Sequence, residues 1–428
     1  MILFVTALLL VLIAFVVFWQ NPRKGIMLLL VAMPVVATTW SVRFGGSSLI
    51  QLSYGGAVGV FLLHWQKLPE EYPAYWKICA GCILIANVSG LFFAPLYYGA
   101  GFMPLFSSAL VAMNLFLGFY IFPAYFVTRS DFRNLLTALM ISGIFPVAVG
   151  IYQAVTGVVW QERTIMGLVR YDGLYHDSVS CRIFIFPALF AAIISLLGNF
   201  SRGFRQRLFC LGIIIFSLIA LYNLSSRAVF GIIALWVIGL MILGKRWMLG
   251  LFIFSMLVAL NFYYDNFLFE RVEFLLSKEI AISSGDMDEQ YFLSGRGMLW
   301  QEHFDVFDDF GILAYLTGAG WLAPAHNEFM RVFFVSGILG LLFFGGSVLR
   351  LLWGAVSSLK SAKLPQVAAF LLLCSYFIDC IGVTPGLYPS YNWFLWGMLG
   401  LLLFKGEEFF RKSDEDDSNP CDQRTDSE

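Results

Sequence analysis

The sequence predicts an all-α membrane protein, a polytopic bundle of about 12–13 transmembrane helices with one large extracytoplasmic loop that contains an amphipathic helix. Composition is the first observation: 59% of the 428 residues are hydrophobic, only 13% are charged, and the mean hydropathy is +0.79. This composition excludes a soluble domain. The runs LLLVLIAFVVF, GIIIFSLIALY and FGIIALWVIGLMIL are apolar on every face, which excludes the alternating strands of a closed barrel.

Apolar runs that could each cross a bilayer as a helix of about 20 residues follow one another along most of the chain. We expect membrane-spanning segments at 2–19, 25–41, 47–64, 77–96, 103–127, 134–156, 181–198, 208–223, 228–243, 247–263, 328–354, 366–383 and 392–404. Segment 2–19 has the position of a signal peptide. Because no basic region precedes it and no small-residue cleavage site follows, we interpret it as the first span.

Basic residues fall in alternate loops, and the positive-inside rule places those loops in the cytoplasm. They are Arg23 and Lys24; Arg129 and Arg133; Arg202, Arg205 and Arg207; Lys245 and Arg246; Lys360 and Lys363; and Lys405, Arg411 and Lys412. The other loops, among them 157–180 and 264–327, then face outward. We therefore expect N-terminal transmembrane helices at 1–207, a membrane domain at 208–404 that includes loop 264–327, and an acidic, disordered cytoplasmic tail at 405–428.

Arg227 is the first candidate functional residue. It lies between two apolar segments at the predicted outer edge, where basic residues are under-represented. Because an arginine close to hydrocarbon is costly unless it meets an anion or water, Arg227 is a candidate anion ligand, with the Ser226 hydroxyl as a further donor. The alternative is an interfacial arginine that pairs with lipid phosphate.

The segment that begins near Arg296 predicts an amphipathic helix in the outer membrane interface. Aromatic and acidic side chains recur on opposite faces at helical spacing: Trp300, His303 or Phe304, and Phe307 on one, and Glu302, Asp305, Asp308 and Asp309 on the other. A cation in the first turn opposes the helix dipole, which favours a ligand contact for Arg296. The alternative is a surface ion pair with Glu302 or Asp305.

His326 is the third candidate, placed by a tight loop at the start of a long apolar helix. The residues that define the loop and the helix are Gly318, Gly320, Pro324, Asn327, Gly337 and Gly340, the last two permitting close helix packing. The helix N-terminus disfavours imidazolium, whereas the nearby Glu328 favours it, so the sign of the His326 pKa shift stays open. A neutral His326 would accept a proton; the alternative is a capping or interfacial histidine.

These residues, in this order, resemble the O-antigen ligase/polymerase family over about residues 210 to 355. The matching positions are Ser226 and Arg227; Arg296 and Trp300; Gly318 and Gly320; His326 and Asn327; and Gly337 and Gly340. Upstream, Arg170 and Gly173 are similar to an Arg-x-x-Gly that the family often carries in the preceding outward loop. The Pro-Asn that commonly follows is replaced here by His176, Asp177 and Ser178, which puts a donor-side role for Arg170 in doubt.

The resemblance implies a metal-independent, inverting glycosyltransferase without a cofactor, in the bacterial inner membrane with its site facing the periplasm. It transfers a glycan from an undecaprenyl-diphosphate donor to a sugar hydroxyl. Arg227 and Arg296 would bind the donor pyrophosphate and His326 would be the general base. Ser226, Arg170, Trp300 and Asn327 would support them. No metal-ligand spacing occurs in the outward loops, where the acids form a solvated surface.

The acceptor stays open at this point. Lipid A core indicates an O-antigen ligase, a second lipid-linked glycan indicates an O-antigen or exopolysaccharide polymerase, and a protein hydroxyl indicates an O-oligosaccharyltransferase. We favour the ligase on family name and length. Alternatives of another class are a lipid-linked oligosaccharide flippase, whose charged site would lie near mid-membrane, and a non-catalytic subunit of an export complex. Nothing in the sequence predicts a nucleic-acid partner.

Overall fold

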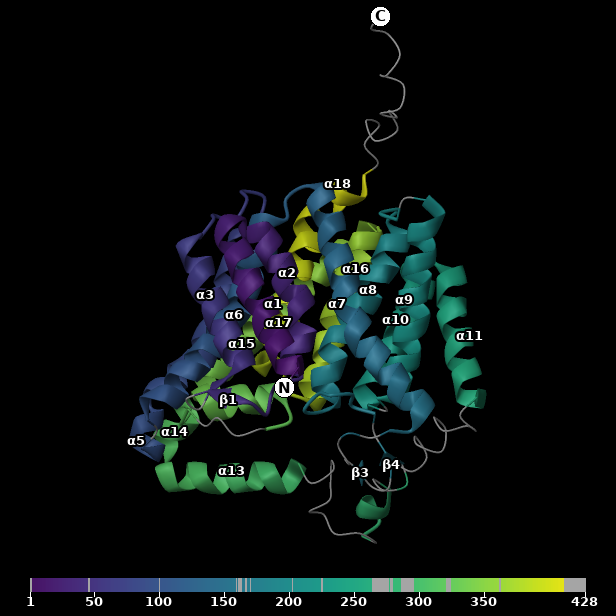
Figure 1. Cartoon of the computed structure of the whole chain (residues 1–428). Helices are drawn as coiled ribbons and strands as arrows, with labels where there is room; N and C mark the ends of the chain where they lie inside the picture. The colour runs from purple at the N-terminus through teal and green to yellow at the C-terminus, as the bar shows by residue number, and fades with distance from the viewer. Residues whose placement is uncertain are drawn as a thin grey trace, which may run out of the picture.

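The protein is almost entirely helical in the computed structural model drawn in Figure 1. The structure describes residues 2–44, 47–99, 101–158, 160, 164–165, 168–169, 171–201, 203–224, 226–263, 277, 280–285, 296–320, 325–361 and 363–411. Within these ranges the strands form two short antiparallel pairs, β1 (Arg43–Phe44) with β2 (Ser47–Ser48) and β3 (Thr164–Ile165) with β4 (Leu168–Val169). The predicted helical class is confirmed.

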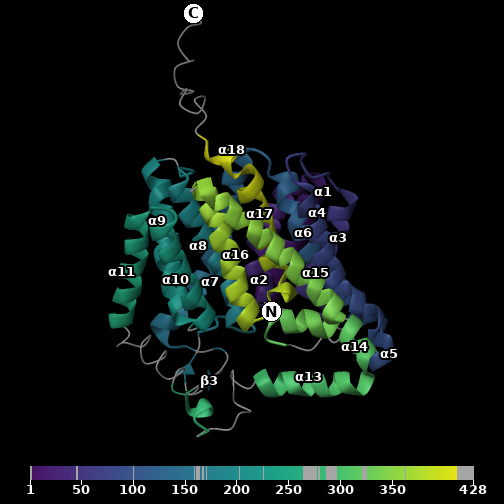
Figure 2. The same cartoon turned by 180° about the vertical axis from the view of Figure 1, so that it is seen from behind.

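Long helices run side by side between two ends of the molecule (Figures 1 and 2). They are α1 (Ile2–Gln20), α2 (Pro22–Ala37), α3 (Leu49–Leu63), α4 (Ala74–Val88), α6 (Phe102–Tyr125), α7 (Arg129–Thr156), α8 (Ser178–Leu197), α9 (Gly203–Asn223), α10 (Arg227–Ile242), α11 (Trp247–Tyr263), α15 (Glu328–Ser358), α16 (Leu364–Gly382) and α17 (Pro389–Gly400). Eight helical stretches in the described ranges are long and apolar enough to cross a membrane. The chain is therefore a multi-pass membrane protein.

Short elements distinguish the two ends. At one end α13 (Arg296–Phe310) lies across the bundle, close to α5 (Ala94–Tyr98) and α14 (Ile312–Thr317), as Figure 1 shows. The 3₁₀ turns η1 (Ser89–Phe92) and η4 (Pro385–Leu387) connect helices there. At the opposite end lie η3 (Leu359–Ser361) and α18 (Gly406–Phe410). We call these the α13 end and the α18 end.

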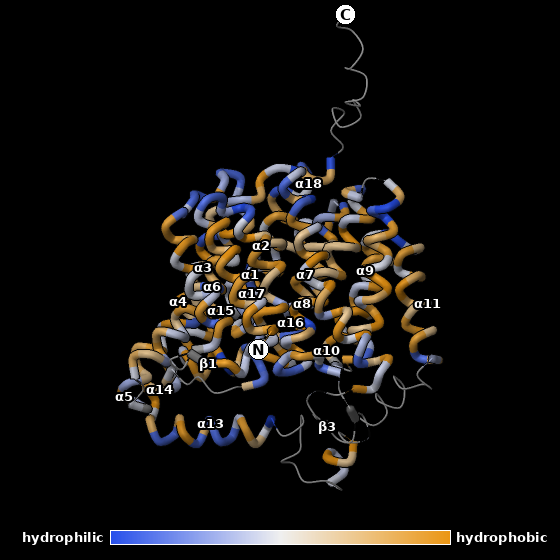
Figure 3. The backbone as a smooth tube through the Cα atoms, viewed as in Figure 1, coloured by the Kyte–Doolittle hydropathy of each residue, from blue (hydrophilic) through white to orange (hydrophobic). Residues whose placement is uncertain are grey.

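Hydropathy follows this arrangement. The helices are apolar along their middle stretches, and hydrophilic residues gather at the α18 end (Figure 3). The loop between α1 and α2 and the turn between α15 and α16, both predicted to be basic cytoplasmic loops, lie at that end. The basic residues of these two loops thus lie at the same end of the bundle, the pattern on which orientation rules depend.

Two hydrophobic cores hold the fold. In the larger one α4 packs along α15, α6 along α17 and α7 along α8, around buried aromatic side chains such as Trp76 and Trp396. A smaller core lies under α13 and consists of Phe307, Ala314, Ala319, Ala325, Phe333 and Phe334. The predicted faces of α13 are confirmed, because His303 and Phe307 are buried whereas Glu302, Asp305, Asp308 and Asp309 are exposed.

The C-terminal region corrects one prediction. We expected a disordered tail from residue 405, but α17 continues through a π-helical turn (Leu401–Lys405) into α18. Phe409 is fully buried and stacks on Phe132, while the Lys405 ammonium contacts a Glu71 carboxylate oxygen at 2.7 Å. The GEEFF segment therefore belongs to the bundle through Phe409; residues 412–428 lie outside the described residues.

Candidate functional site

The predicted glycine loop is fixed to a kink in α15. Gly337 has φ 65° and ψ −163°, a conformation that interrupts the helix and favours glycine. Two backbone amides of the loop donate to carbonyls next to this kink, Ala319 N to Phe334 O at 3.2 Å and Gly320 N to Val335 O at 3.1 Å. The loop and the helix thereby satisfy each other's backbone groups, as an apolar environment requires.

The close approach at this kink leaves no room for side chains. A Cβ atom on Gly337 would lie 2.5 Å from the Gly318 nitrogen, and one on Gly318 would lie 2.3 Å from the Ser336 nitrogen. The sequence predicted close packing between helices at Gly337. The structure confirms it, because a Cβ on Gly337 would also lie 2.5 Å from the Leu316 carbonyl of α14. Gly337 in addition packs against the loop that leads to His326 and so helps to place that residue.

His326 and Asn327 lie at the start of α15. His326 adopts a left-handed backbone conformation, with φ 50°, which is uncommon for a residue other than glycine. Asn327 is the N-cap, and its Oδ1 accepts a hydrogen bond from the Met330 amide at 3.1 Å. The predicted position of His326 just before the helix is confirmed, and its side chain is accessible to solvent.

Helix α13 brings Arg296 to the same place. Arg296 is the first described residue of α13, and its Nη2 donates to the Gly382 carbonyl at 2.9 Å. Trp300, one turn later, donates its indole N–H to the Ala325 carbonyl at 2.7 Å, next to His326. Thus α13 is attached both to the end of α16 and to the residue that precedes the candidate base.

The electrostatics of His326 show which groups lie near it. Partial desolvation and then the positive charge of Arg296 lower the pKa of His326 below its usual value, while Asp177 raises it. Arg296 in α13 and His326 at the start of α15 are thus close enough to interact electrostatically, although thirty positions separate them in the sequence. The acid that opposes the shift is Asp177, the N-cap of α8, and not Glu328 as the sequence suggested.

A turn that the sequence did not single out connects these groups. The 381–388 turn comprises the last two residues of α16 and the connection to α17. Its first two residues present adjacent carbonyls to the site: Gly382 O accepts from Arg296, and Ile381 O accepts from the Asn327 side-chain Nδ2 at 3.5 Å. The turn makes these contacts through its backbone, so its side chains give no sequence signal for a site.

Two buried ion pairs lie at the same end and were also missed. An Arg182 Nη2 atom lies 2.5 Å from an Asp379 oxygen, and both side chains are only 4% exposed. Tyr391 donates its hydroxyl to the same carboxylate at 2.8 Å. The second pair is Glu328 with Arg331 at 2.5 Å. A usable signal was present, because charged residues inside apolar runs are rare and usually functional.

The remaining predicted residues are described in part. Arg227 is the first residue of α10, but its side chain lies outside the described residues, as does Arg170 altogether. Ser226 occupies the N-cap in an extended conformation, and within the described residues its hydroxyl makes no capping hydrogen bond. The structure thus brings together Arg296, Trp300, His326 and Asn327, and the place of Arg227 relative to them stays a prediction.

Known proteins add nothing to this picture. No protein-family model matches the chain, and no curated protein is significantly similar to it. Among the residues that the structure describes, no three His, Cys, Asp or Glu side chains come together as a metal site. Function therefore has to be inferred from the site itself.

Proposed function

We propose that the protein is a membrane glycosyltransferase of the O-antigen ligase/polymerase type. It transfers a glycan from an undecaprenyl-diphosphate donor to a sugar hydroxyl on the periplasmic face of the bacterial inner membrane. The observation that carries this proposal is the juxtaposition of His326 and Arg296, a base of lowered pKa beside a fixed cation. Both are tied, directly or through Asn327, to adjacent carbonyls of one turn.

The distribution of charge supports the orientation. Basic residues lie in the loops at the α18 end, so the positive-inside rule puts that end in the cytoplasm. The α13 end then faces the periplasm, with α13 in the outer membrane interface and its acidic face in water. Figure 1 places the start of α1 at the α13 end, so the chain would enter the membrane from the periplasmic side.

The chemistry follows from the residue types. Neutral His326 accepts the proton of the acceptor hydroxyl while the hydroxyl oxygen bonds to the anomeric carbon. The bond from that carbon to the diphosphate oxygen breaks, and undecaprenyl diphosphate leaves with the electron pair. Arg296, with Arg227, stabilises the charge that grows on the leaving group. A single displacement inverts the anomeric configuration, and the arginines replace a divalent metal.

A reconstituted assay tests the proposal. Purified protein is mixed with undecaprenyl-diphosphate-linked glycan and either lipid A core or more donor, with EDTA present. We expect transferred glycan with inverted linkage in one of the two mixtures. Movement of the donor across vesicles without a new bond would identify a flippase, and no reaction with any acceptor would refute the proposal.

The glycan profile of a deletion strain identifies which acceptor the protein uses. Loss of all capped lipid A core identifies a ligase, which we favour. A single repeat on the core identifies an O-antigen polymerase, and loss of secreted polymer with unchanged lipopolysaccharide identifies an exopolysaccharide polymerase. Glycan missing only from protein identifies an O-oligosaccharyltransferase.

A further inference from the structure

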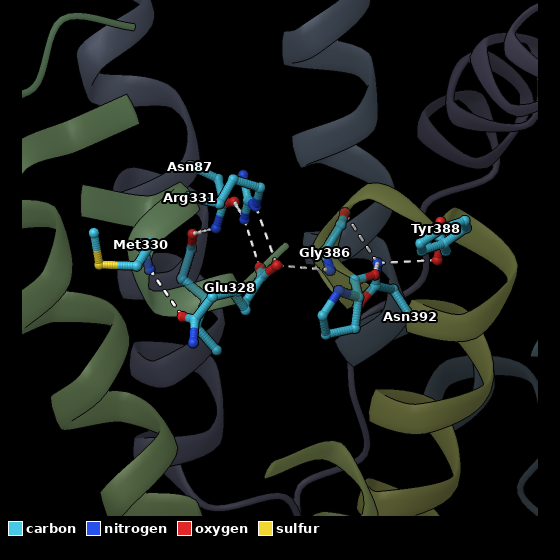
Figure 4. A network of polar contacts seen from close by, with 10 residues as sticks. Asn87, Glu328, Met330, Arg331, Gly386, Tyr388 and Asn392 are labelled. Carbon is cyan, nitrogen blue, oxygen red and sulfur yellow. Dashed lines mark hydrogen bonds and ion pairs between the residues drawn. The ribbon is translucent and has the colours of Figure 1, made fainter. Parts of the chain in front are cut away.

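The geometry points to Glu328 as a positioning residue, which clamps the 381–388 turn to α15 and so keeps Arg296 and Asn327 aligned with His326. The catalytic consequence of this clamp rests on the proposed function; the clamp itself does not. Glu328 follows the candidate base by two positions, and its carboxylate contacts the Gly386 amide of the turn and Arg331 (Figure 4).

Every contact of the Glu328 carboxylate is buried and charge-assisted. Oε1 lies 2.5 Å from Arg331 Nη2, while Oε2 accepts from Arg331 Nε at 3.1 Å and from the Gly386 amide at 3.2 Å. Arg331 also donates to the Asn87 side chain of α4. The pair thus ties the start of α15 to the turn on one side and to the end of α4 on the other.

The turn is shaped to receive this carboxylate. A Cβ atom on Gly386 would lie 2.2 Å from Glu328 Oε1 and 2.7 Å from Arg331 Nη2, so a side chain there would displace the contact. From the opposite side the Asn392 amide of α17 donates to the Pro385, Gly386 and Tyr388 carbonyls, at 3.1, 3.2 and 3.0 Å. Figure 4 shows the turn held between these two side chains.

The clamped turn is also the one that receives the candidate site. Arg296 and Asn327 come from different elements, α13 and the start of α15, but donate to the adjacent carbonyls of Gly382 and Ile381. A displacement of the turn would therefore move Arg296 relative to His326. A positional error of about 1 Å is enough to reduce catalysis severely.

Stability alone does not account for the ion pair. Taking two charges out of water has a large desolvation cost, and apolar side chains of similar volume are often at least as stabilising. Glu328 is 0% exposed and Arg331 is 6% exposed, so hydration does not offset the desolvation cost of either residue. What the pair supplies, and what apolar side chains could not, is a directed hydrogen bond to the Gly386 amide.

Hydrogen–deuterium exchange of the full-length protein tests the clamp without any activity. Two variants, Glu328→Ala and Gly386→Ala, each remove the contact between the Glu328 carboxylate and the Gly386 amide. The control, Asp131→Ala, removes a buried carboxylate that pairs with Arg23 at the α18 end. In both clamp variants we expect peptides covering 381–392 and 296–304 to exchange about tenfold faster, as loss of a charge-assisted hydrogen bond implies.

The control should leave those two peptides unchanged, even if it lowers thermal stability. Unchanged exchange in 381–392 in a folded clamp variant would overturn the inference, and so would a uniform increase over the whole chain. If Glu328→Ala does not fold, Gly386→Ala decides, because it keeps both charged residues in the chain. Glu328→Gln, which keeps an acceptor for the Gly386 amide, should restore slow exchange in part.

The transfer assay then examines the catalytic consequence. We expect the clamp variants to lose kcat by more than they raise KM for the donor, and to shift the acid limb of the pH profile as Arg296 moves from His326. Asp131→Ala should change neither. If wild-type protein transfers no glycan but the exchange results hold, the proposed function fails and the clamp stands.

Discussion

The two ends of the bundle treat charge differently. At the α18 end, ion pairs reach water: Lys363 and Glu407 are 54% and 48% exposed, and Glu71, the partner of Lys405, is 54% exposed. Even where Asp131 is buried, its partner Arg23 is 43% exposed. At the α13 end the two arginine–carboxylate pairs of the described residues are buried on both sides, as in Arg182 with Asp379, at 4% each. The contact of His176 with Asp177 at that end is partly exposed.

This difference shows at which end of the bundle ion pairs fix the positions of neighbouring groups. Exposed pairs add little, because water competes for each partner and salt screens them. A buried pair is costly to form and still costlier to break, so it fixes the position of whatever it touches. The candidate site lies at the end with the buried pairs, and the basic residues that set orientation lie at the other.

The largest effect should come from His326. If it is the base, His326→Ala should lower turnover by about 10²–10⁴-fold while donor affinity changes little. Arg296→Ala should weaken donor binding as well as turnover, because it removes a charge-assisted contact. Turnover and donor Kd, measured on the same preparations, separate the two roles. Near-normal transfer by the His326 variant would remove it from the mechanism.

The next largest effect concerns the buried pair. Asp379→Ala leaves Arg182 buried without its anion, so the free energy of unfolding should fall by about 3–5 kcal/mol. Denaturant titration in mixed micelles measures it. The double variant Asp379→Ala/Arg182→Leu should recover part of the loss, since no unpaired charge remains. A single variant as stable as wild type would remove the contrast between the ends.

These buried pairs also mark how far the fold could be predicted. Each predicted apolar segment contains a helix, because length and hydropathy determine a helix in hydrocarbon. The faces of α13 were predictable from the spacing of Phe307 and its neighbours. The kink at Gly337 was not, because it depends on a loop that packs against α15 and not on the local sequence.

The site was predictable in its residue types but not in its framework. Arg296 and His326 stand out as polar residues beside apolar runs, and the structure brings them together. The 381–388 turn accepts hydrogen bonds from Arg296 and Asn327 through backbone carbonyls. Because every residue has a carbonyl, no sequence pattern could reveal the role of this turn. Glu328 was visible, but sequence proximity suggested an effect on His326, whereas its side chain faces Arg331 and Gly386.

A smaller effect is expected at Arg227. A bidentate contact to diphosphate needs the planar guanidinium, so Arg227→Lys should lose about tenfold or more in turnover despite its retained charge. An interfacial anchor that pairs with lipid should tolerate lysine. Turnover is measured only after expression and membrane insertion are verified. A correctly inserted, fully active variant would leave Arg296 as the principal donor ligand.

Asp177 should affect only the pH dependence. Its charge raises the pKa of His326, so Asp177→Asn should lower that pKa further. Neutral His326 is the active form, and activity is lost as pH falls through this pKa. The acid limb of kcat/KM against pH should therefore move to lower pH, by less than about one unit. Asparagine keeps the N-cap of α8, so stability is a suitable control. A shift to higher pH would contradict the assignment.

The smallest effect is expected at the α18 end. The Lys363 ammonium lies 2.7 Å from a Glu407 oxygen, as close as many buried pairs, but both side chains reach water. Because each partner is hydrated again when the contact is lost, Lys363→Ala should leave the free energy of unfolding and the turnover unchanged within error at physiological ionic strength. The same titration used for Asp379→Ala measures it. A loss as large as that of Asp379→Ala would mean that distance, not burial, sets the weight of an ion pair in this protein, and the contrast between the two ends would be wrong.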